Sequence, residues 1–146
     1  MDKIPKDVQA ICEQLAKGYE RRRKDYQNRR NDIIYSGGVS YADMVGGSRG
    51  NGTTDTVASK TERLENLEAC IDVKLMRAVE QSLSATGADV PRNLRERLHK
   101  AIMLNVESGK DYPYELLNID EFSRSEFYRR RKGFVRGIGV ELGLWG

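Results

Sequence analysis

The amino-acid sequence predicts an all-α fold, and three observations lead to this prediction. Apolar residues recur at three- and four-residue steps through residues 5–34 and 55–85, as they do along one face of an α-helix. A glycine-rich stretch separates these two segments. Near the C-terminus, Ser123 and Glu126 have the spacing of a helix capping box. We therefore expect a long N-terminal helical hairpin joined by a Gly-rich loop, followed by a smaller helical module.

The first helix is expected over residues 5–34. Pro5 suits the first turn of a helix, because the N–H that proline lacks would have no partner there. Gly18 weakens the helix and could mark a bend. The apolar positions form a narrow stripe, which indicates a seam to a partner helix and not one wall of a thick core. These positions are Ile4, Val8, Ile11, Leu15, Tyr19, Tyr26 and Ile33.

Residues 36–54 are expected to form the loop, because their six glycines disfavour both helix and strand. A phosphate-binding loop is a poor match, since no Gly-Lys-Ser/Thr occurs and no apolar strand leads into the stretch. A linker or hinge is the better interpretation. The glycines stand at positions 37, 38, 46, 47, 50 and 52.

The second long helix is expected over residues 55–85, with Asp55 or Thr56 as its N-cap. Paired with the first helix, it completes an antiparallel hairpin over residues 1–87. The narrow apolar faces of both helices also favour a homo-oligomer. The seam of the second helix consists of Leu64, Leu67, Ile71, Leu75, Val79 and Leu83.

Residues 88–146 are expected to form the second module, which begins with a helix from Pro91 to Ser108. A short helix over residues 112–117 follows, with Pro113 in its first turn, and then a turn over residues 118–121. The inward face of the Pro91–Ser108 helix is expected to consist of Leu94, Leu98, Ala101, Ile102 and Val106.

The last helix is expected to begin at Arg124. In a capping box, the Ser123 hydroxyl accepts from the Glu126 N–H, and the Glu126 carboxylate accepts from the Ser123 N–H. Phe122 and Phe127 have the spacing of a hydrophobic staple. The order of these elements, a short helix, a turn and a capped basic helix, is that of a helix-turn-helix motif. The inward face is expected to consist of Phe127, Phe134, Ile138 and Leu142, and the interior glycines are Gly133, Gly137 and Gly139.

Composition narrows the class of protein. The 146 residues are 32% charged, and no apolar run reaches the roughly 18 residues that a membrane helix needs. The start, MDKIPKDVQ, lacks the apolar stretch of a signal peptide. Cys12 and Cys70 lie on apolar stripes and are expected to be buried and reduced. An intracellular protein without a membrane segment is the expectation.

Catalysis is not expected from this sequence. No carboxylate pair stands in an apolar cleft, and no metal-ligand spacing occurs. The single histidine, His99, lies off the apolar face and is expected at the surface. The sequence therefore predicts neither an enzyme nor a cofactor or metal site.

The charges are segregated although the net charge is only +3. One basic block spans residues 21–30 and another spans residues 129–132, whereas acids concentrate in residues 62–80 and 111–121. Segregation of this kind favours a surface that faces a polyanion. A solvated basic face on each helix would give the same pattern.

The stretch FSRSEFYRRRKGF, residues 122–134, resembles the recognition helix of the sigma factor region 4 family. The whole architecture resembles the RinA/ArpU-type late transcriptional activators of phages, with MVGGSRGNGTTD at residues 44–55 and VELGL at residues 140–144. The first helix of the motif departs from the family pattern, with Leu117 at its centre and Asp120 and Glu121 in the turn.

The resemblance implies a sequence-specific DNA-binding regulator in the cytoplasm of a bacterial host cell, with RNA polymerase as a further candidate partner. Arg124, Ser125, Tyr128 and Arg129, which follow the Ser123 cap, would meet base edges. Arg130, Lys132 and Arg136 would lie nearer phosphate, and Arg131 would be partly buried or a phosphate clamp.

Three other interpretations stay open. A small terminase subunit for phage DNA packaging also joins a helix-turn-helix to oligomerising helices, although such subunits usually carry the DNA-binding module first. An antiterminator would bind both DNA and RNA polymerase. A structural protein could use its basic surface to bind an acidic partner.

Overall fold

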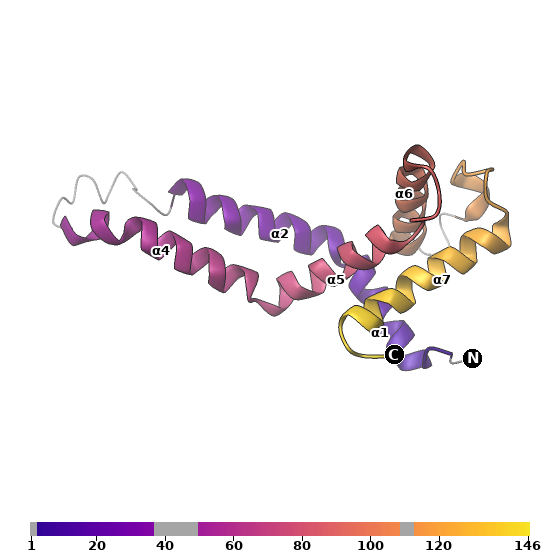
Figure 1. Cartoon of the computed structure of the whole chain (residues 1–146), viewed down its shortest axis with the longest axis horizontal. Coiled ribbons are helices and arrows are strands. Elements are labelled where there is room, and N and C mark those ends of the chain that lie inside the picture. Colours follow the sequence, from indigo (N-terminus) through magenta and orange to yellow (C-terminus); the bar gives the residue numbers. More distant parts are fainter. Residues whose placement is uncertain (1–2, 37–49, 109–112) are drawn as a thin grey trace. The chain divides into compact units, whose positions relative to one another are not determined.

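The computed structural model describes residues 3–36, 50–108 and 113–146, and these residues form helices and no strand. The predicted all-α class is thus confirmed for the described residues. Figure 1 shows the elements in chain order. They are α1 (Lys6–Lys17), α2 (Tyr19–Asn31), the π-helical turn η1 (Asp32–Ser36), α4 (Gly50–Glu68), α5 (Ile71–Ala85), α6 (Arg92–Ser108), the 3₁₀ turn η3 (Tyr114–Leu116) and α7 (Arg124–Glu141).

The chain divides into two compact units, and the division does not follow the boundary expected at residues 87 and 88. The larger unit combines Met1–Tyr19 with Leu75–Gly146, and the smaller unit is Glu20–Lys74. The first helix therefore belongs with the C-terminal helices, because α1 supplies apolar residues to their core.

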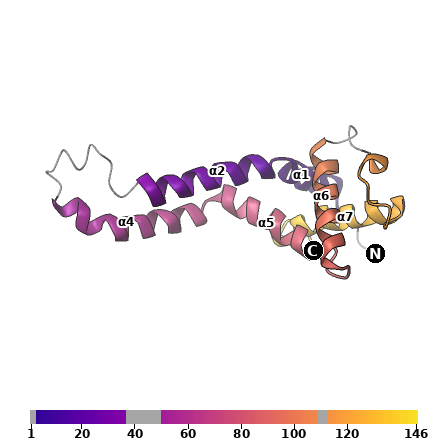
Figure 2. The ribbon, with the colours of Figure 1, turned by 90° about the horizontal axis from the view of Figure 1, so that it is seen from above.

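The core of the larger unit lies where α1 packs against α6 and α7 (Figures 1 and 2). The hydroxyl of Tyr19, the first residue of α2, also donates to Glu80 of α5 at 2.7 Å. The helices α6 and α7 confirm the predicted helices from Pro91 and Arg124 to within one residue at their starts. The buried cluster consists of Cys12, Ala16, Val79, Leu98, Ala101, Ile102, Val106, Ile119, Phe122, Phe127, Phe134, Val135 and Ile138.

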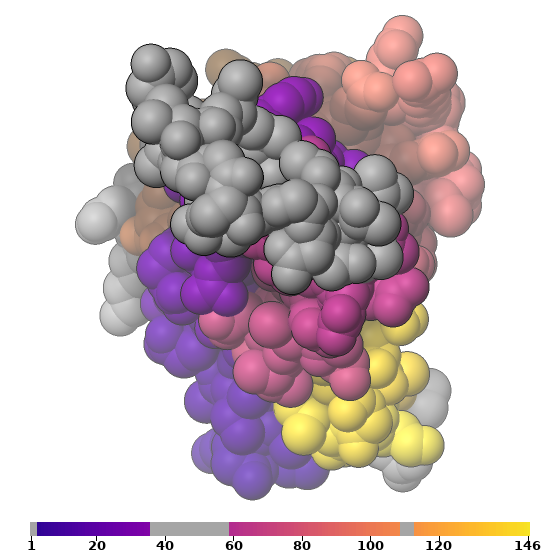
Figure 3. Space-filling view, turned by 90° about the vertical axis from the view of Figure 1, so that its left-hand side faces the viewer, coloured from indigo at the N-terminus to yellow at the C-terminus, as the bar shows by residue number. Residues whose placement is uncertain are grey.

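The smaller unit contains α2 and α4, which run side by side (Figures 1 to 3). The Lys60 ammonium of α4 donates to the Ile34 carbonyl of η1 at 3.1 Å. Arg22 of α2 pairs with Asp72 at 3.6 Å. No residue of α2 is buried, whereas Leu67 of α4 and Val73 of α5 in the same unit are buried.

The two long helices predicted for the hairpin are each interrupted. The prediction of one helix over residues 5–34 is wrong, because α1 ends at Gly18 and a new helix follows. The prediction over residues 55–85 is wrong as well, since the chain turns at Ala69 and Cys70. There the Cys70 N–H donates to Leu67, three residues back, which tightens the last turn of α4.

The loop expected over residues 36–54 lies largely outside the described residues. Its two ends differ from the prediction: Ser36 belongs to η1, and Gly50–Thr54 belong to α4. Glycine lowers helix propensity by about 1 kcal/mol per residue without forbidding a helix. The prediction from the number of glycines therefore extended the loop too far at both ends.

Burial corrects three further predictions. Cys12 is fully buried as expected, and burial raises the pKa of its thiol. Cys70 is only half-buried, because it lies in the turn between α4 and α5. Ile11 and Ile71, which were assigned to apolar seams, are exposed. His99, which was expected at the surface, is only partly exposed, with its Nε2 2.6 Å from the Thr86 carbonyl oxygen.

Candidate nucleic-acid interface

The start of α7 is fixed by the predicted cap. Ser123 has the extended conformation of an N-cap residue, and its Oγ accepts from the Glu126 N–H at 3.1 Å. The second half of the capping box is not formed, since the Glu126 carboxylate accepts from Arg130 instead. Phe122 and Phe127, the two staple residues, are buried in the same cluster.

The segment before α7 is one 3₁₀ turn and not the short helix predicted over residues 112–117. Asn118 adopts a left-handed φ of 53°, which ends the turn and lets Ile119 and Phe122 enter the core. Arg97 of α6 holds the segment by donating to the Asn118 carbonyl at 2.6 Å and to Glu121 at 2.5 Å. The N-terminal end of α7 is thereby attached to α6.

The two sides of α7 differ sharply. One side is buried against the core through Phe127, Phe134, Val135, Ile138 and Gly139. The other side carries an exposed stripe, defined here by residues that recur at three- and four-residue steps over about 16 Å of helix. These residues are Ser125, Arg129, Lys132 and Arg136.

The three cations of the stripe have few acidic neighbours. The closest described carboxylate to Arg129 is that of Glu126, at 3.8 Å, and the Arg129 side chain is 71% exposed. No salt bridge joins Lys132 or Arg136 to a carboxylate within the described ranges. The Arg136 guanidinium lies over the ring of Trp145, 4.3 Å from its centre. The stripe is therefore positively charged and open to solvent.

Three predicted residues lie beside the stripe. Arg124 is exposed and pairs with Glu115 at 2.9 Å. An exposed pair of this kind contributes only about 0–1 kcal/mol, so Arg124 can exchange Glu115 for another anion. Tyr128 is half-buried, and its ring meets Phe127 edge-to-face with centroids 5.2 Å apart. Ser123 is exposed, but its hydroxyl already accepts the capping hydrogen bond from the Glu126 N–H.

Arg130 does not face solvent with the other cations. Its side chain is only 10% exposed and makes a bidentate ion pair with Asp89. The Nη1–Oδ1 and Nη2–Oδ2 distances are both 2.9 Å. Glu126 accepts from the same guanidinium, which also lies over the Phe122 ring at 5.0 Å. These contacts tie α7 to the turn after α5, so Arg130 acts within the fold.

The ion pair should be visible in an acid titration. The hydrogen bond from Arg130 lowers the pKa of Asp89 from 3.8 to about 2, and the carboxylate in turn raises the pKa of Arg130. A carboxyl with a depressed pKa stabilises the fold above its unfolded pKa and loses that contribution as pH falls through its folded pKa. We expect the Asp89 carboxyl carbon to titrate with a midpoint near 2 by NMR, and at a higher pH in Arg130→Gln, because the largest cause of the lowered pKa is then removed. The same midpoint in both proteins would contradict the pairing.

Arg131 is half-buried, as the sequence predicted. Its Nε donates to the Asn105 amide oxygen at 2.5 Å and its Nη1 to Glu13 at 3.2 Å. Arg131 thus links α7 to α6 and α1 and does not belong to the exposed stripe.

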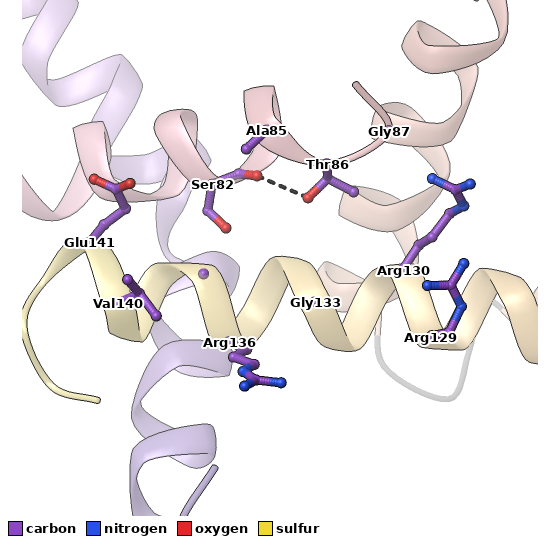
Figure 4. Close-up of a pocket in the computed structure, with 11 residues that line it drawn as sticks. Ser82, Ala85, Thr86, Gly87, Arg129, Arg130, Gly133, Arg136, Val140 and Glu141 are labelled. Atoms are coloured by element: carbon purple, nitrogen blue, oxygen red, sulfur yellow. Dashed lines mark hydrogen bonds between the residues drawn. The ribbon is translucent and has the colours of Figure 1, made fainter. Parts of the chain in front are cut away.

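A groove of about 430 Å³ lies along one side of α7, between this helix and the end of α5 (Figure 4). In Figure 4, Gly133 lies between Arg129 and Arg136 along α7, with Ser82 and Thr86 across from it. This groove could not be predicted from the sequence, because its two walls are 42 or more residues apart in the chain. Trp145, too, was not predicted to contribute.

Neither a metal site nor a membrane segment is found within the described ranges. No three His, Cys, Asp or Glu side chains there are placed to hold a metal ion. None of the helices there has the length and apolar character to cross a membrane. Comparison of the chain with models of protein families, with curated proteins and with solved structures returned no match.

Proposed function

We propose that this protein is a sequence-specific DNA-binding regulator of transcription, of the phage late-gene activator type, and that α7 enters the major groove. The observation that carries the proposal is the exposed stripe of Ser125, Arg129, Lys132 and Arg136 on a helix whose other side is buried. A capped helix with exposed cations on one side has the shape and charge that the major groove accepts.

The proposal assigns different tasks to the two halves of the stripe. Arg124, Ser125 and Arg129 lie in the first two turns of α7, where recognition helices meet base edges. Lys132 and Arg136 lie further along and would meet phosphates, which fix the position of the helix on the duplex. Tyr128 and Arg130, held by contacts within the fold, would support their neighbours and not touch DNA.

In this proposal α1 and α6 carry the recognition helix, in place of the short helix of an ordinary helix-turn-helix. Arg97 and Arg131 supply the links from α6 to the turn before α7 and to α7 itself. The smaller unit would set the oligomeric state or meet RNA polymerase. Its helix α2 presents exposed Arg21, Lys24 and Arg30 for such a contact.

The proposal is tested by binding of the purified protein to the promoter DNA beside its own gene and to scrambled DNA, across a series of salt concentrations. We expect a preference of about 10³ or more for the promoter. Arg129→Ala should weaken promoter binding by about 1–3 kcal/mol, roughly 5- to 150-fold, if Arg129 reads a guanine. Arg124→Ala should also reduce the preference.

Lys100→Ala is the matched control, because Lys100 is an exposed cation of α6 outside the stripe. It should leave the preference unchanged. Equal loss on promoter and scrambled DNA in Arg129→Ala would assign Arg129 to phosphate. Weak, salt-dependent binding without any preference would refute the regulator and direct attention to a packaging subunit or an antiterminator.

A further inference from the structure

Gly133 lies in the middle of α7, and the packing of the described residues does not explain why glycine is there. Outside the backbone of its own helix, a Cβ at Gly133 would meet no described atom within 4 Å. At Gly137 a Cβ would lie 2.2 Å from Ser82 Oγ, and at Gly139 it would lie 3.3 Å from Cys12 Sγ. Glycine inside a helix is destabilising relative to alanine. The two later glycines permit close helix packing, whereas Gly133 keeps a space open on the surface.

The open space at Gly133 is part of the groove beside α7. Arg129 and Arg136 line the same groove, about one helical turn to either side of Gly133. Arg130 also lines it but is already paired with Asp89. Glu141 lines the groove near the end of α7 and disfavours an anion there, so the favourable position for an anion is beside Gly133.

Trp145 holds Arg136 in place at this groove. The chain after α7 turns back at Gly143, whose φ is +71°, and the N–H groups of Leu144 and Trp145 both donate to the Gly139 carbonyl. This turn sets the Trp145 ring 4.3 Å from the Arg136 guanidinium. A guanidinium stacked on an aromatic face keeps its N–H donors in its own plane, where an outside acceptor can take them.

We infer that this groove binds one backbone phosphate of DNA, an inference that rests on the proposed function. Arg136 binds the phosphate, Trp145 positions Arg136, and the missing side chain at Gly133 lets the phosphate approach the helix. Guanidinium N–H groups and phosphate oxygens form short, charge-assisted hydrogen bonds, often two at a time. The phosphate fixes the depth at which α7 sits in the major groove.

The decisive variant is Gly133→Ala, because its effects on folding and on binding should have opposite signs. Alanine should raise the melting temperature by about 2–4 °C, since it favours the helix and meets no atom. It should weaken binding to labelled promoter duplex by roughly 3- to 10-fold and lower the slope of log K against log salt by about one. A variant that is more stable yet binds less cannot owe its loss to unfolding.

Three further variants separate the roles of Arg136 and Trp145. Arg136→Ala should reduce the salt slope by about one, whereas Lys100→Ala, with the same loss of charge, should change affinity much less. Trp145→Ala should lower the affinity and the salt slope in the same direction as Arg136→Ala but by less. Trp145→Phe, which keeps an aromatic face, should retain most of the wild-type affinity.

The outcomes separate this inference from the proposed function. Binding of duplex by Gly133→Ala with wild-type affinity and salt slope would overturn the phosphate site and leave the regulator standing. No binding of duplex by the wild-type protein would remove both. Trp145 is the only tryptophan, so its fluorescence reports on this groove. Quenching by inorganic phosphate alone, with equal displacement of the duplex, would show a site for free phosphate and overturn the DNA assignment.

Discussion

Phe127→Ala should lower the free energy of unfolding by about 3–5 kcal/mol, the usual cost of removing a buried phenylalanine ring. Phe127 is fully buried. Its ring meets Tyr114 and Tyr128 edge-to-face, with centroids 5.9 and 5.2 Å away, so it joins η3 to α7. Urea unfolding followed by far-UV circular dichroism gives the free energy directly.

Phe127→Leu is the control, because leucine keeps most of the apolar volume and should cost about half as much or less. Ser123→Ala removes only the cap of the same helix and should cost about 1 kcal/mol. A loss below about 1 kcal/mol for Phe127→Ala would mean that the ring is not part of the core.

Gly137→Ala and Gly133→Ala should change stability in opposite directions, with a difference of about 2–3 kcal/mol. The two glycines lie in the same helix, one turn apart, so the gain in helix propensity is the same. At Gly133 the new methyl group meets no packing partner among the residues that the structure describes. At Gly137 it would overlap the Ser82 hydroxyl, which donates to the Phe134 carbonyl at 2.6 Å. The Ser82 side chain must rotate away and lose this buried hydrogen bond. Its Cβ would still lie 3.2 Å from the new methyl group.

A double-mutant cycle identifies the cause. Ser82→Ala removes the overlapping oxygen, so Gly137→Ala should cost less in that background than in the wild type. Additive losses would mean that α5 and α7 do not meet at this pair. Equal stabilisation by alanine at Gly133 and at Gly137 would contradict the close approach of these two helices.

The parts of the fold that depend on nearby residues could be predicted from the sequence. The Ser123 cap and the staple of Phe122 and Phe127 involve residues at most five apart, and they set the start of α7 correctly. The regular apolar spacing in α6 likewise gave its limits and its buried face. Arg131, which was expected to be partly buried or a phosphate clamp, is partly buried.

The parts that depend on distant residues could not be predicted. The partner of Arg130 is Asp89, 41 residues away, and nothing local distinguishes Arg130 from the exposed Arg129. The turn at Ala69 and Cys70 contains neither glycine nor proline. Gly133 and Gly137 look alike in the sequence, and only the crossing with α5 shows that one is packed and the other open.

The larger unit combines Met1–Tyr19 with Leu75–Gly146, and this limits the order in which the protein can fold during synthesis. The ion pair between Glu13 and Arg131 spans 118 residues, and Cys12 of α1 lies against Gly139 of α7. The apolar side of α1 therefore has no complete partner until α7 has left the ribosome. Contacts between residues so far apart slow folding and leave apolar surface exposed meanwhile. Nascent chains stalled before residue 124 should thus expose α1 to chaperones and proteases, however stable the finished protein is.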